Sequence, residues 1–209
     1  MKKGSLIFIV VFLLMICSIM DVKAKSITGI VSSKNAYVQK SSVKNSKTIY
    51  ILKQGTSVNI VGIKNGYYIV AASNNYGYVK KSSISLNYIL VDISDQKLYV
   101  YKNGLKKWNT NVVTGKKGVS DTPCGHYVLQ RRNFKRKTHL MGNAYVEYWM
   151  PFITSRGIGF HDASWRSSSS FNSKTYLTNG SHGCVNMKKG DAKKLFENAP
   201  SRIDVLIRK

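Results

Sequence analysis

Hydrophobic and polar residues alternate with a period of two over much of the chain, which is the pattern of half-buried β-strands. Alternating runs over residues 56–63 and 67–72 flank Lys64-Asn65-Gly66, and an Asn-Gly pair between such runs is typical of a β-hairpin. One helical pattern is readable near the C-terminus, where apolar residues recur on one face of residues 191–199 and Pro200 follows. The pattern predicts a mainly β fold with one short α-helix.

The predicted strands divide into two modules. The first contains short β-type runs and turns, among them AYVQ (36–39), LKQG (52–55), VNI (58–60), NGYY (65–68) and GYV (77–79). The order of these motifs resembles a bacterial SH3-like domain, which implies a small β-barrel over residues 25–86 that binds cell-wall peptides. A folded spacer that binds little is the alternative for this module.

The second module covers residues 87–209. Runs at residues 88–92 and 97–101 are paired strand candidates around Ser94-Asp95-Gln96. Further strands are predicted near residues 110–114, 127–131, 158–161 and 203–207. With the helix, they predict a β-sandwich that carries one short α-helix.

The first residues have the pattern of a secretory signal peptide. Lys2 and Lys3 give a positive start, residues 6–20 are apolar, and Val22-Lys23-Ala24 matches a small-residue cleavage site. The apolar run is short of the roughly 20 residues that a membrane-spanning helix needs. We expect residues 1–24 to be removed, with no transmembrane anchor left, and the mature protein to be exported to the cell wall.

Basic residues greatly outnumber acidic ones: 33 Lys and Arg against 9 Asp and Glu, a formal net charge of +24. The lysines are scattered along the chain, with the densest basic run at residues 131–137, and this weighs against a specific nucleic-acid site. For an exported protein, the excess charge predicts attraction to anionic cell-wall polymers.

Cys184 stands out among the three cysteines because its neighbours are polar or small, in the sequence SHGCVNM (181–187). A thiol with an ordinary pKa is mostly protonated at neutral pH, so a catalytic cysteine needs a base. His182 and His161 are the candidates. We favour His161, because a base from another element can be aimed independently of the thiol. The N–H groups of Gly183 and Cys184 are candidates for an oxyanion hole.

These motifs resemble a known family. VDISDQKLYVY (91–101), VTG (113–115), TPCG (122–125), HDASW (161–165) and SHGCVNM (181–187) are similar, in this order, to the catalytic domain of YkuD-type L,D-transpeptidases. The resemblance implies that Cys184 is the nucleophile, that His161 is its base, and that the backbone carbonyl of Asp162 orients the imidazole. Two features depart from the family pattern. Residues 162–180, which separate His161 from Ser181, are more numerous than the family commonly shows and predict a longer loop over the site, and Asn186 stands where many members carry arginine.

Other side chains near these motifs are candidates for substrate contact. Ser181 and Asn186 flank the nucleophile, and His182 is a candidate for orienting the loop or binding substrate. Tyr148, Trp149 and Trp165 flank the presumed cleft, although burial in the core is the usual fate of such aromatic residues. A metal site formed by the two histidines and Cys184 is disfavoured because the chain has no C-x-x-C pair.

The resemblance implies an exported cysteine acyl-transferase that takes a peptidoglycan tetrapeptide stem as donor, releases D-alanine and cross-links a second stem, with no cofactor. It also implies that carbapenems acylate the nucleophile. Two alternatives stay open at this point: an L,D-carboxypeptidase that uses water as acceptor, and a non-catalytic wall-binding protein. Cys124 is predicted to have no role, but a bridge from Cys124 to Cys184 is another outcome that the sequence allows.

Overall fold

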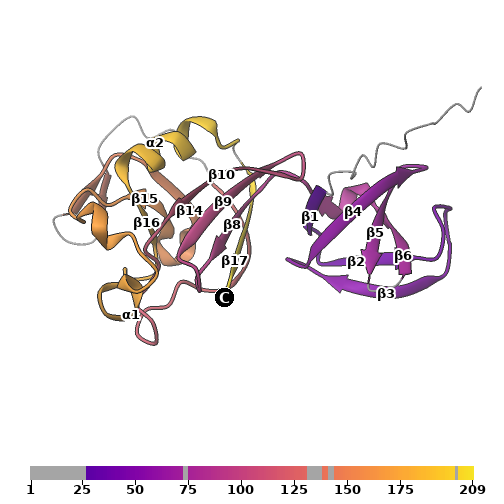
Figure 1. The fold of residues 1–209 in the computed structure, drawn as a ribbon, viewed down its shortest axis with the longest axis horizontal. Coiled ribbons are helices and arrows are strands. Elements are labelled where there is room, and N and C mark those ends of the chain that lie inside the picture. The colour runs from indigo at the N-terminus through magenta and orange to yellow at the C-terminus, as the bar shows by residue number, and fades with distance from the viewer. Residues whose placement is uncertain (1–26, 73–74, 131–137, 141–143, 201) are drawn as a thin grey trace, which may run out of the picture.

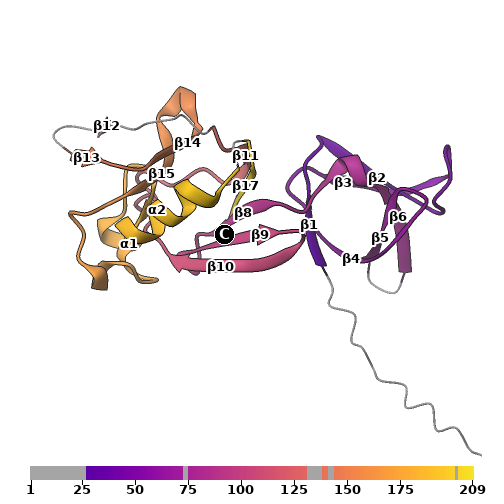
Figure 2. The same cartoon turned by 90° about the horizontal axis from the view of Figure 1, so that it is seen from above.

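The computed structural model describes residues 27–72, 75–130, 138–140, 144–200 and 202–209. The predicted signal peptide (1–24) and the basic run at 131–137 lie outside the described residues. Within the described part of the chain, no helix has both the length and the apolar character needed to cross a membrane. Figures 1 and 2 show two β-rich modules that are joined end to end.

The N-terminal module is a seven-stranded sheet in the order β3-β2-β6-β5-β4-β1-β7. Its strands are β1 (Ile27–Val31), β2 (Asn35–Gln39), β3 (Thr48–Lys53), β4 (Ser57–Lys64), β5 (Tyr67–Ala72), β6 (Asn75–Lys80) and β7 (Ile84–Ser85), with a 3-10 turn at Lys81–Ser83 before the last. The sheet curls around its own apolar face (Figure 1), but β3 and β7 do not pair, so the closed barrel of the prediction is not formed by the described residues.

The predicted hairpin joins β4 to β5. Lys64 pairs with Tyr67, and the two residues between them, Asn65 and Gly66, both have positive φ (48° and 81°). This backbone twist matches the twist of the paired strands, which is why Asn-Gly is favoured here. Alternate residues of the strands then point to one face and form the core of the module: Val31, Ala36, Val38, Val58, Ile60, Val70, Val79 and Ile84.

The C-terminal module contains two larger sheets. A five-stranded sheet has the order β10-β9-β8-β17-β11, and a three-stranded sheet has the order β14-β15-β16. The bounds are β8 (Tyr88–Asp92), β9 (Lys97–Lys102), β10 (Leu105–Asn111), β11 (Gly125–Val128), β14 (Trp149–Ile153), β15 (Ile158–Asp162), β16 (Val185–Met187) and β17 (Asp204–Arg208), with a small hairpin of β12 (Thr138–Leu140) and β13 (Ala144–Val146). Both sheets contribute to one buried core, which includes Val91, Leu98, Phe160, Val185 and Val205.

Helix α2 (Lys189–Asn198) is the helix predicted from the sequence. It buries Ala192 and Leu195 in the shared core and packs against β15 (Figure 2). The prediction of a single helix was wrong, because α1 (Thr175–Asn179) forms within the segment that was expected to be a long loop. This helix has five residues, which is too few for a clear helical period.

The two modules meet at a packed junction. The tip of the β9–β10 hairpin reaches β1, where the Thr28 N–H donates to the Gly104 carbonyl at 2.9 Å (Figure 1). Beside it, Ile30 from the first module is buried with Tyr88 and Leu206 from the second. Apolar burial and backbone hydrogen bonds therefore both connect the modules.

Candidate active site

The candidate site is built on the parallel pair of strands β15 and β16. His161 stands opposite Asn186, and Phe160 stands opposite Val185. Side chains alternate between the faces of a strand, so Phe160 and Val185 point into the core while His161 and Asn186 share the other face. Cys184 precedes Asn186 by two residues and belongs to that same face. Parallel pairing thus brings together two motifs that are far apart in the sequence.

Cys184 is held as a buried thiol just before β16. Its side chain is 6% exposed and packs with Val146 and Trp149. The Sγ lies 3.5 Å from the Gly157 carbonyl, to which a thiol can donate. Burial raises the pKa of Cys184 above its ordinary value of 9.0, and a backbone hydrogen bond from Gly159 opposes this shift. The resting cysteine is therefore a protonated thiol at neutral pH.

His161 is 5% exposed and its ring lies between Trp149 and Trp165, with ring centroids 6.0 and 5.9 Å away. Its Nδ1 is 2.8 Å from the backbone carbonyl of Asp162. A carbonyl can only accept, so Nδ1 carries the hydrogen and Nε2 is the basic nitrogen of the neutral ring. Burial lowers the pKa of His161 below its ordinary value of 6.5, while the Asp162 carbonyl and carboxylate oppose the shift. The imidazole is therefore a neutral base at pH 7.

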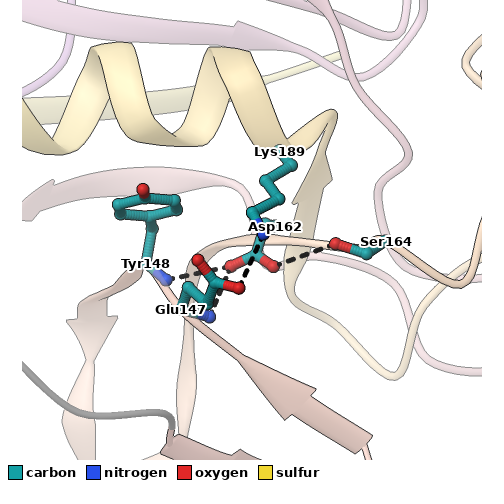
Figure 3. Close-up of polar contacts among 5 residues, drawn as sticks. All are labelled: Glu147, Tyr148, Asp162, Ser164 and Lys189. Carbon is teal, nitrogen blue, oxygen red and sulfur yellow. Dashed lines mark hydrogen bonds and ion pairs between the residues drawn. The ribbon is translucent and has the colours of Figure 1, made fainter.

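The carboxylate of Asp162 has a structural role, as Figure 3 shows. It accepts hydrogen bonds from the backbone N–H groups of Glu147 and Tyr148, at 2.8 and 2.9 Å, and from the Ser164 hydroxyl at 3.3 Å. Next to this cluster, Lys189 at the start of α2 forms an ion pair of 2.6 Å with the Glu147 carboxylate. The side chain of Asp162 therefore holds the backbone just before β14, and its backbone carbonyl holds the His161 ring.

The loop before Cys184 is held by hydroxyl groups. The Ser181 hydroxyl donates to the Cys184 carbonyl and accepts from the Gly183 N–H at 3.1 Å. Gly183 has φ of 115°, a conformation that side chains disfavour. Because its N–H is already donated within the loop, the predicted part of Gly183 in an oxyanion hole would require that hydrogen bond to break.

Thr122 connects this loop to a neighbouring segment. It is 2% exposed, its hydroxyl donates to the Gly183 carbonyl at 2.8 Å, and the same oxygen accepts from the Gly115 N–H at 2.9 Å. The TPCG motif entered the family resemblance, but nothing in the sequence indicated that Thr122 contacts this loop. A buried hydroxyl in two hydrogen bonds is costly to remove, so Thr122 fixes the position of the residues next to Cys184.

A cavity of about 310 Å³ opens over this face. Its lining is Gly157, His161, Trp165, Arg166, Asn179, Gly180, Ser181, His182, Cys184 and Asn186. Six of the predicted site residues therefore share one cavity. His182 and Trp165 are exposed at it, the latter by 53%. Trp149 instead packs beneath the site, and the ring of Tyr148 packs on Phe196 of α2 at a centroid distance of 5.7 Å.

Comparison with known protein families identifies the C-terminal module. Residues 86–207 match the model of the YkuD family, the L,D-transpeptidase catalytic domain. The chain belongs to this family. As a YkuD domain, the module is related to enzymes that cross-link peptidoglycan, which lies outside the cytoplasm. A search of curated protein sequences gave no match.

Solved structures agree with the YkuD assignment. A crystal structure of an Enterococcus faecium L,D-transpeptidase, in a cysteine-to-serine variant, is similar with a TM-score of 0.57 and 23% identity, covering 85% of this chain and 76% of that one. The carbamoyl enzyme formed by Ldtfm and avibactam has the same TM-score, with 22% identity and coverage of 86% and 75%. The E. faecium catalytic domain acylated by ertapenem is 29% identical, with a TM-score of 0.50 and coverage of 58% and 96%.

Neither of the described cysteines of this YkuD chain is in a disulfide. Cys124 is exposed and free, and Cys184 is buried and free. Among the described residues, no three His, Cys, Asp or Glu side chains come together in a way that could hold a metal ion. The structure therefore presents the thiol of Cys184 in its reduced form.

The long segment between the two YkuD motifs supplies part of the cavity. Asn179 and Gly180, at the end of α1, line the cavity, and so does Arg166. Phe171 anchors the segment by packing in a small buried cluster with Val113 and Ala163. Sequence reasoning expected a loop over the site but did not single out Arg166; its only signal is a lone arginine after the HDASW motif.

Proposed function

We propose that the protein is a cysteine-dependent L,D-transpeptidase that joins peptidoglycan stem peptides through a thioester on Cys184. The observation that supports this most is that His161 on β15 and Cys184, which directly precedes the parallel strand β16, line one cavity. The hydrogen bond from His161 Nδ1 to the Asp162 carbonyl leaves Nε2 as the proton acceptor.

In the first half-reaction, Nε2 of His161 takes the proton of the Cys184 thiol as Sγ attacks the carbonyl carbon of the third residue of a donor tetrapeptide. The new C–S bond forms a thioester and the C–N bond to the terminal D-alanine breaks. The imidazolium then gives its proton to the leaving amine nitrogen, so D-alanine departs as a free amino acid. Covalent catalysis in this form divides one difficult acyl transfer into two easier steps.

In the second half-reaction, the side-chain amine of another stem attacks the thioester, and His161 accepts the proton that this amine loses. The amide that forms is the cross-link, and the Cys184 thiol is restored. The displaced peptide bond supplies the driving force, so the proposal requires no cofactor. Charge that develops on the carbonyl oxygen is stabilised in this proposal by the Cys184 N–H, with His182 at the rim to contact substrate.

The same proposal covers the rest of the chain. Residues 1–24 direct export and are removed, residues 25–86 form an SH3-like module that binds the wall, and residues 87–209 form the catalytic domain. The positive charge holds the protein to anionic wall polymers. The acylation of the related E. faecium domain by ertapenem supports the expectation that carbapenems acylate Cys184 here.

The test uses residues 25–209 under reducing conditions with a purified disaccharide-tetrapeptide, and mass spectrometry follows the products. Cross-linked dimers that have lost D-alanine are expected, and they should be absent with Cys184→Ala. Tripeptide alone would make the protein an L,D-carboxypeptidase. If both proteins leave the substrate unchanged while both still bind isolated cell walls, the enzymatic proposal is wrong and wall binding is the function.

A further inference from the structure

Arg166 is a half-buried cation that lines the candidate cavity. Its Nη1 donates to the Asn179 carbonyl at 2.9 Å, and its Nε is buried without a hydrogen-bond partner in the described structure. None of the ion pairs among the described residues includes it. A guanidinium stays charged even where burial lowers its pKa, and removing it from water without an anion is costly. This cost points to an anionic ligand.

Asn186 supplies a second unsatisfied group in the same cavity. Its side chain is only 2% exposed, it shares the face of His161, and its Oδ1 has no partner among the described residues. Buried polar atoms are nearly always hydrogen-bonded, so an orphan acceptor in a binding cavity is explained best by a donor on the ligand. The cavity thus offers a cation and a hydrogen-bond acceptor, which suits a peptide that ends in a carboxylate.

The position of Arg166 relative to His161 indicates which carboxylate of the donor stem it binds. Arg166 and His161 line the same cavity, and the positive charge of Arg166 adds to the effect of burial in lowering the pKa of the imidazole. In the proposed reaction, His161 protonates the leaving nitrogen of D-alanine, so this residue must lie next to the imidazole. The free carboxylate of D-alanine is only two bonds from that nitrogen. The carboxylates of earlier stem residues lie on the opposite side of the scissile bond.

We propose that Arg166 binds the terminal carboxylate of the donor tetrapeptide. It thereby restricts the donor to stems in which a single residue follows the bond that is broken. Asn186 accepts a hydrogen bond from a backbone N–H of the same stem. The proposal rests on the proposed function and adds a determinant of donor length to it. A pentapeptide stem has an amide where the tetrapeptide has this carboxylate, so Arg166 discriminates against it.

The test compares a disaccharide-tetrapeptide with its C-terminal amide, which lacks only the charge. The unmodified protein should prefer the acid by about 10- to 100-fold in kcat/KM, because a charge-assisted hydrogen bond to a carboxylate contributes that much. Arg166→Gln should lose this preference by becoming slower on the acid alone, and Arg166→Lys should keep part of it. Arg156→Gln is the control, since it removes the same charge from an exposed residue that does not line the cavity.

Three results would overturn the proposal. They are equal rates of the unmodified protein on acid and amide, an equal loss on both donors in Arg166→Gln, and a preference that follows amidation of a carboxylate earlier in the stem instead. The second of these would show that Arg166 only supports the loop through Asn179. Calorimetry of both donors with Cys184→Ala separates the two proposals, because a preference for the acid in binding supports Arg166 even where no product forms.

Discussion

Replacing Thr122 with valine should loosen the loop that carries Cys184. The substitution keeps nearly the same side-chain shape but removes the hydroxyl of a residue that is only 2% exposed. Two backbone groups then lose their partner: the Gly115 N–H, now 2.9 Å from the hydroxyl, and the Gly183 carbonyl, now 2.8 Å from it. Gly115 and Gly183 are both buried, so water can replace the lost partner only if the loop moves.

The expected cost follows from these two bonds. A buried polar group left without a partner costs about 1–3 kcal/mol, so the loss of a partner by two groups should lower the free energy of unfolding of Thr122→Val by roughly 2–6 kcal/mol. If the loop opens to admit water, the loss falls toward the lower end of this range, and the rate of Cys184 acylation falls instead because the nucleophile is displaced. Stability and acylation rate must therefore be measured together.

Urea unfolding followed by tryptophan fluorescence gives the stability, and mass spectrometry of the ertapenem adduct against time gives the acylation rate. Thr48→Val is the matched control, because this threonine is exposed on β3 and its replacement should change stability by no more than about 0.5 kcal/mol. A Thr122→Val protein that loses less than about 1 kcal/mol and acylates at the original rate would refute the assigned role of the hydroxyl.

Three further predictions concern charge. Because burial lowers the pKa of His161, acylation of Cys184 should stay level as the pH falls through 6.5 and should decline only below it; stopped-flow acylation with a midpoint above 6.5 would contradict the neutral base. Asp162→Ala leaves two half-buried N–H groups unpaired and should cost roughly 2–4 kcal/mol in urea unfolding. The same change removes a carboxylate charge that raises the pKa of His161, so the midpoint of the acylation profile should move to lower pH, and a midpoint that stays in place would contradict this reasoning. Burial would raise the pKa of Asp204, but hydrogen bonds from His126 and Ser85 outweigh it and lower the pKa from 3.8. The contribution of Asp204 to stability is therefore present above pH 3.8 and is lost as the pH falls through the lowered pKa. Asp204→Asn should flatten that acid decline in unfolding titrations, and an unchanged decline would exclude the carboxylate as its source.

Several features could be predicted from the sequence because their causes are local. The turn at Asn65 and Gly66 follows from the backbone angles that these two residues tolerate, and α2 follows from its apolar spacing. The candidate nucleophile Cys184 was found from its polar neighbours alone. The family, now shown by the match over residues 86–207, was recognised from motifs that lie in one order along the chain.

Other features depend on contacts between distant segments and left no local signal. Nothing near Thr122 in the sequence shows that its hydroxyl reaches Gly183, 61 residues away. The parallel pairing of His161 with Asn186 likewise follows from the fold of the whole module. Tyr148 and Trp149 are adjacent in sequence, yet one packs on α2 and the other beneath the cavity, because alternate residues point to opposite faces.

The neutral state of the Cys184 thiol also has a consequence for how long this thiol stays reduced. Peroxide and other oxidants attack the thiolate, and they attack it fastest where it is exposed. Cys184 is buried, and its raised pKa keeps it protonated, so oxidation to sulfenic acid should be slow. In the proposed mechanism, His161 draws the proton away only as the substrate carbonyl is attacked, so the strong nucleophile exists only while substrate occupies the cavity. The thiol of Cys124 is exposed rather than buried, so it should be oxidised first.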